Sequence, residues 1–342
     1  MQNRLSKGLL LGNDGNLVQA GYSTNLIKEY NRNQIKAPKM RIKEWDYYYI
    51  GNQHKGIAFT LADNSYVGLA SVSILDFEEK TYITKSSLKL FTNGKLNLPN
   101  NTNEGKVIWV DNNYYIKFDV NDGKRYIEVK IKNYKDGNPF EAKFELVDST
   151  DESMVIAIPF DKPKHFYYNQ KINCIKAKGF YKYNDEVVQF SDTDTRAVLD
   201  WGRGVWTYKN TWYWSSLSTI DENGDEIGFN LGYGFGDTTK ASENMLFYKG
   251  KAYKLEDVEF IIPKDSNNKY KYLEPFVIRS KDKSIDLSFT PILDRYDNIN
   301  FGVIKSVQHQ VFGRFNGTIK VEGKEVEFKD FISFVERVTN WL

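Results

Sequence analysis

From Ile42 onward, apolar and polar residues alternate through most of the sequence, and this period constrains the fold more than any other feature. Dipeptides that favour tight turns separate the alternating runs: Asn93-Gly94, Asp122-Gly123, Asp136-Gly137, Asn223-Gly224 and Asn316-Gly317. Such dipeptides supply the positive φ angles that two-residue hairpin turns need. Because hairpins join neighbouring antiparallel strands, the pattern predicts an all-β protein and disfavours a parallel nucleotide-binding sheet.

The number of alternating runs, roughly eighteen, indicates the architecture. A long antiparallel meander leaves no unpaired edge strand when it closes into a barrel, so we predict two β-barrels in tandem. A pair of two-sheet sandwiches is the alternative. A loop bracketed by two prolines, Pro159–Lys164, predicts an N-terminal barrel domain with an N-terminal arm at residues 1–163 and a second barrel domain at 164–342.

The one clear helix is predicted at the C terminus. Its apolar residues fall at i, i+3, i+4, i+7 and i+11, the spacing of one helix face: Phe331, Phe334, Val335, Val338 and Leu342. Asp330 stands where an N-cap residue would lie. We therefore expect the second barrel to be followed by a C-terminal helix.

Charge and composition exclude several classes of protein. The net charge is +2, with 47 basic and 45 acidic residues interspersed, which argues against a nucleic-acid-binding protein. The lone Cys174 excludes an intrachain disulfide and, among apolar neighbours, should be buried. None of His54, His165 and His309 has a second His or Cys at metal-ligand spacing, so we predict neither metal nor cofactor.

The apolar runs are all short. None approaches the ~20 residues of a membrane helix, and Met1–Asn16 lacks the pattern of a signal peptide. These features predict a cytoplasmic protein. The sequence also has no Gly-x-Ser-x-Gly, His-Glu-x-x-His or phosphate-loop motif.

Aromatic residues concentrate between Asp200 and Ser216, which hold four of the seven tryptophans. Trp212 and Trp214 share one face of a predicted strand. Two indoles beside small residues can line a small-molecule pocket, in which the indole N–H groups donate hydrogen bonds to the ligand. The alternative is that both tryptophans belong to the core.

The next strand has a face with almost no side-chain volume. Between Ile227 and Gly236, this face holds Gly228, Asn230, Gly232, Gly234 and Gly236. A strand this poor in side chains suggests that something approaches its backbone closely. Either a second sheet or helix packs against the glycines, or they leave room for a ligand inside a barrel.

Charged residues near these aromatics suggest further roles. Arg203, between two glycines, is expected to pair with Asp200 or Glu243. The pair either closes a barrel end, or Arg203 clamps an anionic ligand group or holds a carboxylic acid ready for proton transfer. His309 is either a hydrogen-bonded strand histidine or a proton carrier in a barrel mouth.

Two sets of candidate residues result. The candidates for proton transfer are Asp200, Asp237, Glu243 and His309. The candidates for ligand contact are Trp45, Arg203, Trp206, Trp212, Trp214, Asn230, Tyr233 and Asn244.

Three segments in combination resemble a bacterial family of unknown function. They are Lys43–Tyr48 (KEWDYY), Ala197–Trp206 (AVLDWGRGVW) and Gly228–Gly234 (GFNLGYG). That family is distantly similar to proteins built from two lipocalin-like barrels, among them carotenoid 1,2-hydratases, tocopherol cyclases and AttH-like proteins. The resemblance implies tandem lipocalin-like barrels. It also implies acid-catalysed chemistry on isoprenoid double bonds in an aromatic cavity, but it assigns no residue a role.

Three functions remain open at this stage. The first is binding of a small apolar or amphipathic, lipid- or isoprenoid-like ligand in a barrel cavity. The second is a metal-independent hydratase, cyclase or isomerase that uses a carboxylic acid in an aromatic pocket. The third is a structural or interaction protein whose tryptophans are only core.

Overall fold

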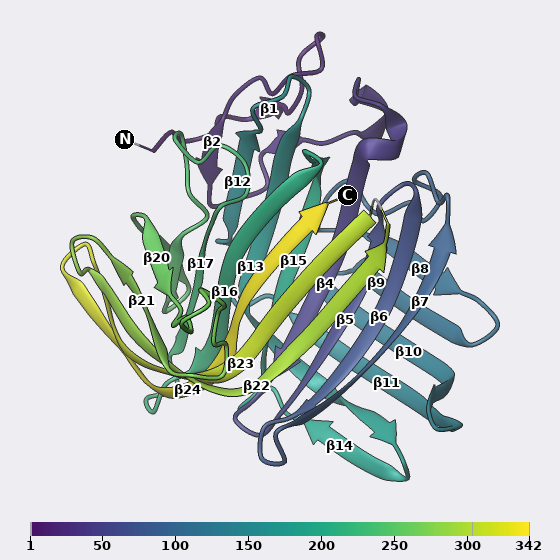
Figure 1. The fold of residues 1–342 in the computed structure, drawn as a ribbon, viewed down its shortest axis with the longest axis vertical. Helices are drawn as coiled ribbons and strands as arrows, with labels where there is room; N and C mark the ends of the chain where they lie inside the picture. The colour runs from purple at the N-terminus through teal and green to yellow at the C-terminus, as the bar shows by residue number, and fades with distance from the viewer. Residues whose placement is uncertain (1, 303, 342) are drawn as a thin grey trace.

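The computed structural model describes residues 2–302 and 304–341. It consists of two large curled antiparallel sheets, each a half-barrel (Figure 1). Two short 3₁₀ turns, η1 (Arg32–Gln34) and η2 (Lys39–Arg41), are the helical elements of the described chain. The all-β prediction is therefore confirmed. None of the described residues forms a helix long and apolar enough to cross a membrane.

The first sheet has 13 strands, and most of them form one continuous path. In spatial order the path is β7 (Thr81–Leu90), β6 (Val67–Asp76), β5 (Lys55–Asp63), β4 (Ile42–Gly51), β15 (Arg196–Val205), β13 (Phe166–Tyr183), β11 (Asn138–Val147), β10 (Lys124–Lys135), β9 (Tyr114–Asn121) and β8 (Gly105–Val110). Outside the path, β12 (Met154–Pro159) pairs with β13 and with β2 (Gly21–Ser23), and β14 (Glu186–Phe190) pairs with β13. The short strands β1 (Gly8–Leu9) and β3 (Lys28–Glu29) pair separately.

The second sheet has nine strands. Their order is β19 (Lys251–Lys254), β18 (Met245–Tyr248), β17 (Glu226–Tyr233), β16 (Lys209–Ile220), β24 (Lys324–Trp341), β23 (Ile304–Val321), β22 (Ile285–Phe301), β21 (Phe276–Ser280) and β20 (Val258–Ile261). The chain passes from the first sheet to the second between Val205 and Lys209. The predicted boundary at residue 163 falls between β12 and β13, which pair within the first sheet.

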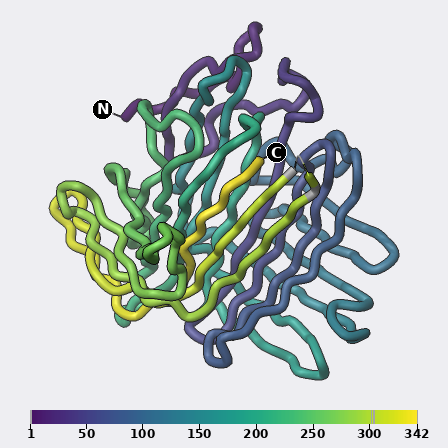
Figure 2. Tube along the Cα trace, in the orientation of Figure 1, coloured from purple at the N-terminus to yellow at the C-terminus, as the bar shows by residue number. Residues whose placement is uncertain are grey.

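The apolar side chains form a core inside each half-barrel and a further layer between the two sheets. Phe59 and Trp109 are buried in the first core, and Phe229 and Phe315 in the second. Between the sheets, the ring of Tyr49 on β4 lies 5.3 Å from that of Phe312 on β23 and 5.6 Å from that of Phe334 on β24. In Figure 2 the yellow-green and yellow C-terminal strands run beside the purple and blue strands of the first sheet.

The predicted C-terminal helix is wrong, because the segment is the long strand β24. Phe334 contributes to the layer between the sheets and Val335 to the core of the second half-barrel. A strand buried on both faces does not alternate, so its apolar residues can imitate helical spacing. Asp330, the predicted cap, has a φ of 58° beside a register shift against β23. Leu342, the last residue of the predicted stripe, lies outside the described residues.

The predicted hairpin turns are confirmed at three positions. Asp122-Gly123, Asp136-Gly137 and Asn223-Gly224 each join two adjacent paired strands. Asn93-Gly94 lies in the longer connection between β7 and β8, which are not neighbours in the sheet. Asn316-Gly317 lies within β23 at a register shift, so it marks a β-bulge and not a turn.

Candidate functional site

A buried ion-pair cluster joins the two sheets. Nζ of Lys171, on β13, lies 2.9 Å from Oδ1 of Asp200, on β15, and 3.7 Å from Oε2 of Glu243, which precedes β18 in the second sheet. The Lys171 side chain is only 2% exposed. An ammonium taken out of water in this way needs compensating carboxylates, and here both sheets supply one.

Asp200 accepts hydrogen bonds from two further side chains. Nε1 of Trp45 donates to Oδ2 at 3.1 Å, and Nδ2 of Asn169 donates to Oδ1 at 2.6 Å. Trp45 lies on β4 and Asn169 on β13, the two neighbours of β15. Asp200 is therefore held by the two strands that flank its own, and its cationic partner is Lys171.

Glu243 lies against the glycine-rich face of β17. Asn230 donates to the backbone oxygen of Glu243 at 2.8 Å and to its Oε2 at 3.3 Å, and accepts from Nε1 of Trp214 at 2.7 Å. A Cβ on Gly232 would lie 2.6 Å from Oε1 of Glu243. A Cβ on Gly228 would lie 2.9 Å from the sulfur of buried Cys174. The glycine face is thus occupied by close protein neighbours.

Glu336, a third carboxyl group, was not predicted. It lies on β24 and is 5% exposed. Its Oε1 accepts from Nε1 of Trp212 at 2.8 Å, and its Oε2 accepts from the amide groups of Gln308 at 2.7 Å and Gln310 at 3.1 Å. The available signal was an acidic residue inside an apolar run, at a position outside the apolar stripe of the predicted helix.

Burial weakens the acidity of Glu243 and Glu336. Burial raises the pKa of Glu243, and the charge of Asp200 raises it further, although Lys171 opposes the shift. Burial also raises the pKa of Glu336, against the hydrogen bond from Trp212. Because desolvation penalises the charged form, burial favours the protonated form of the Glu243 and Glu336 carboxyl groups.

Aromatic rings pack beside the carboxyl groups, with Trp206 at their centre. Its ring centroid lies 5.1 Å from Trp45, 5.0 Å from Phe235 and 5.9 Å from Trp212, and Tyr167 stacks on Trp45. Trp45 and Trp212 are partly exposed, whereas Trp206 is buried. The buried Nε1 of Trp206 has no hydrogen-bond partner among the described residues. We call these five rings the aromatic cluster.

Arg203 lies on the other face of β15, inside the first half-barrel, so both of its predicted partners are wrong. Its Nη1 donates to Oδ1 of Asp46 at 2.9 Å and to the backbone oxygen of Trp45 at 2.7 Å. The guanidinium carbon lies 4.2 Å from the ring of Trp201. The Arg203 side chain is 0% exposed, which makes it part of the core network.

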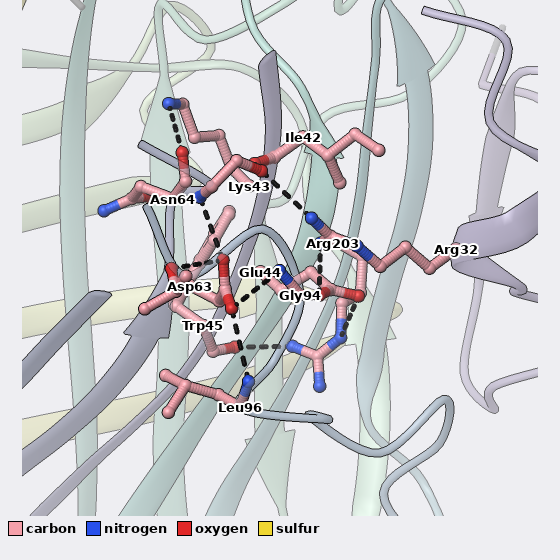
Figure 3. A network of polar contacts seen from close by, with 12 residues as sticks. Arg32, Ile42, Lys43, Glu44, Trp45, Asp63, Asn64, Gly94, Leu96 and Arg203 are labelled. Carbon is pink, nitrogen blue, oxygen red and sulfur yellow. Dashed lines mark hydrogen bonds and ion pairs between the residues drawn. The ribbon is translucent and has the colours of Figure 1, made fainter. Parts of the chain in front are cut away.

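Figure 3 shows the continuation of this network. Glu44 pairs with Arg32, and Asp63 accepts from the backbone N–H groups of Gly94 and Leu96. Arg32, Glu44 and Gly94 also line a pocket of about 560 Å³ at the mouth of the first half-barrel. The carboxyl cluster does not line this pocket.

The remaining predicted residues lie apart from the cluster. Asp237 is exposed, and hydrogen bonds from Thr239 hold its pKa below the usual range. Tyr233 stacks on Tyr213 inside the second half-barrel. Asn244 accepts from the backbone N–H of Gly232 at 2.7 Å. His309 pairs with Asp294 on the inner face of the second sheet, as described below.

No metal site is evident in the described chain. Residues 2–302 and 304–341 contain no group of three or more His, Cys, Asp or Glu side chains placed to hold a metal ion. The cluster itself presents carboxyl groups, one lysine, amides and indoles.

Comparison with solved structures shows that the fold of this chain is similar to that of a known protein of low sequence identity. An AttH-type protein of Nitrosomonas europaea has 11% sequence identity and a TM-score of 0.58, and the alignment covers 92% of this chain and 97% of that protein. Kievitone hydratase of Nectria haematococca has 12% identity and a TM-score of 0.49 over 96% of this chain and 98% of the hydratase. A comparison with curated protein sequences gives no match.

The family model described as domain of unknown function DUF2804 matches residues 2–341. This match covers all three segments that carried the family resemblance in the sequence and confirms that resemblance. The chain belongs to the DUF2804 family.

Proposed function

We propose that the protein binds a small apolar or amphipathic ligand at the aromatic cluster between the two half-barrels. The observation that carries the proposal is the Nε1 of Trp206, a buried donor without a partner among the described residues. An unsatisfied buried donor costs about 1–3 kcal/mol, and a ligand oxygen at this place would remove that cost. The surrounding rings would contact the apolar part of the ligand.

Access to this donor involves the two partly exposed indoles. Trp45 and Trp212 flank Trp206, and each anchors its own N–H on a carboxylate, Asp200 or Glu336. A ligand reaches the buried N–H only if one of these indoles moves aside. Ligand entry would therefore change the fluorescence of Trp45 or Trp212, which gives the proposal a direct readout.

Farnesol is a suitable probe, because it joins an isoprenoid chain to one hydroxyl group, and farnesene is the matched hydrocarbon. We expect the wild-type protein to bind farnesol about fivefold more tightly than farnesene, as one hydrogen bond of about 1 kcal/mol implies. Trp206→Phe keeps a ring but removes the N–H, so it should abolish this difference. Tryptophan fluorescence titration measures both ligands, and Trp109→Phe, in the first core, is the control.

Either of two results would contradict the ligand proposal. One is the absence of saturable binding of both probes to the wild-type protein. The other is a preference for farnesol that survives in Trp206→Phe. Native mass spectrometry of the purified wild-type protein adds an independent check, since a co-purifying small molecule should be lost or depleted in the variant.

The second candidate function is proton transfer to a bound ligand, as in a hydratase, cyclase or isomerase. It is favoured by the meeting of Asp200 and Glu243 at Lys171, and by the hydrogen bonds that tie Asp200 to Trp45 and Glu336 to Trp212 in the aromatic cluster. The Lys171 ammonium lies 4.3 Å from the ring of Trp214, so cation–π contact already occurs in this cluster. A buried carboxylic acid with a raised pKa, such as Glu243 or Glu336, is a suitable general acid.

The raised pKa of Glu243 predicts a specific dependence of stability on pH. Above the usual value of 4.5, the folded state keeps a proton that the unfolded chain releases, so the unfolding free energy falls as pH rises. Glu243→Gln removes this contribution. The unfolding free energy of the variant minus that of the wild type should therefore increase from about pH 4.5 upward.

Urea unfolding measured between pH 4 and 8 gives these free energies. Glu104→Gln, at an exposed position, is the control and should give a difference that does not change with pH. If Glu243→Gln also gives a constant difference, Glu243 titrates normally, and its part in proton transfer is excluded.

A further inference from the structure

A row of directly opposed residues crosses the inner face of the second sheet, away from the carboxyl cluster. Tyr296 on β22 is opposite His309 on β23, and His309 is opposite Arg337 on β24. Arg337 is opposite Tyr213 on β16, which is opposite Tyr233 on β17. Residues directly opposite one another in a sheet share a face. The row therefore brings one arginine, one histidine and three tyrosines together.

Arg337 has no acidic partner among residues 2–302 and 304–341. Its Nε donates to the hydroxyl of Tyr213 at 3.0 Å, and its Nη1 donates to the hydroxyl of Tyr272 at 3.3 Å. By contrast, Arg279 and Arg314 in the same sheet each pair with an aspartate. Nη2 makes no hydrogen bond to a described residue, and Nη1 has a second N–H besides the one that Tyr272 accepts, so both Nη groups can donate to a ligand. This edge matches a carboxylate in bidentate geometry.

His309 lies next to this edge with one ring nitrogen engaged. Its Nδ1 lies 2.7 Å from Oδ2 of Asp294, and its ring stacks at 3.8 Å on Tyr272, the residue that also bonds Arg337. Asp294 fixes the orientation of the imidazole ring through Nδ1. Nε2 has no hydrogen-bond partner in the described part of the chain and, when protonated, is a second donor for an anion.

The charges around the row favour an anion. Nζ of Lys264 lies 4.6 Å from the ring of Tyr270, and the Arg337 guanidinium carbon lies 4.6 Å from the same ring. The acidic groups near the row are Asp294, which pairs with His309, and Glu259, whose charge acts on Tyr233, and neither is paired with Arg337. A half-buried arginine that is bonded only to tyrosine hydroxyls resembles a prepared anion site more than a structural ion pair.

We propose that Arg337 and His309 form a binding site for the carboxylate of a small organic acid. Arg337 presents its two Nη groups to the two carboxylate oxygens, and Nε2 of His309 donates to one of them. Tyr270 and Tyr272, whose rings lie beside Arg337 and His309, contact the apolar part of the acid. This site is independent of the proposed ligand at the aromatic cluster, because it lies on the opposite face of β24.

Benzoate is the probe, and benzamide is its uncharged analogue of the same size. Isothermal titration calorimetry should show saturable binding of benzoate to the wild-type protein and at least about tenfold weaker binding of benzamide. Arg337→Gln should lower benzoate affinity by at least about tenfold, since the bidentate contact is lost. Arg279→Gln makes the same change at an exposed arginine of the same sheet and should leave the affinity unchanged.

Two further variants keep the test decisive. His309→Gln should weaken benzoate binding by about fivefold, and it provides the measurement if Arg337→Gln does not fold by circular dichroism. Trp206→Phe should bind benzoate like the wild type, which separates this site from the aromatic cluster. The proposal is overturned if the wild-type protein does not bind benzoate, or if Arg337→Gln or His309→Gln, when folded, binds it with unchanged affinity.

Discussion

Arg203→Ala is expected to lower the unfolding free energy by about 3–5 kcal/mol. The substitution removes the charge that pairs with Asp46 and leaves that buried carboxylate without its cation. Arg203 also caps the backbone oxygens of Trp45 and Pro99, and both would lose a donor. Urea denaturation followed by tryptophan fluorescence measures the loss.

The controls for this experiment separate charge from packing. Arg203→Lys keeps the charge but not the planar fork, so we expect an intermediate loss. Arg279→Ala, at an exposed position of the second sheet, should change the unfolding free energy by less than about 0.5 kcal/mol. A loss below about 1 kcal/mol for Arg203→Ala would show that the Asp46 pair is not a structural centre of the first half-barrel.

Gly202→Ala is the second substitution with a large expected effect. A Cβ at this position would lie 1.9 Å from Cζ2 of Trp45, which no side-chain contact tolerates, so the indole ring must move. We expect a loss of about 1–3 kcal/mol from overpacking. The movement should also break the hydrogen bond from Trp45 to Asp200 and weaken farnesol binding at the aromatic cluster.

The matched control is Gly12→Ala. A Cβ there would meet the end of the Asp14 side chain at 3.0 Å, and that side chain is exposed and can turn away. Its unfolding free energy should stay within about 0.5 kcal/mol of the wild type. If Gly202→Ala matched this control in stability and farnesol binding, Trp45 would not be fixed in place by the glycine.

The sequence predicts which side chains of a strand lie on the same face. It does not predict what that face packs against. Period-two alternation placed Trp212 and Trp214 together and placed Asn230 with Gly228 and Gly232, as the structure has them. The prediction was wrong for Gly234 and Gly236, which follow the end of β17 with positive φ angles. Alternation does not say whether such a face looks into a half-barrel or toward another sheet. Lys171 was missed for this reason, since a charged residue in a strand is usually solvent-facing.

The same rule, applied more strictly, would have avoided one error. Asp200 and Arg203 are three positions apart, so on a regular strand they lie on opposite faces and cannot pair. The false C-terminal helix has a different cause. Both faces of β24 are buried, so its residues do not alternate between apolar and polar. The sequence of β24 alone does not show that other parts of the protein cover both of its faces.

Glu336 and Arg337 are consecutive residues of β24, and their side chains lie on opposite faces of the sheet. The same holds for Trp212 and Tyr213 of β16. Deleting one residue upstream in β24 would turn Glu336 toward the tyrosines and Arg337 toward the carboxyl groups, because a one-residue slip inverts every side chain. Members of this family should therefore tolerate length changes in the turn at Glu322-Gly323 but not between Phe331 and Glu336. Indel positions can thus show which relatives keep both sites.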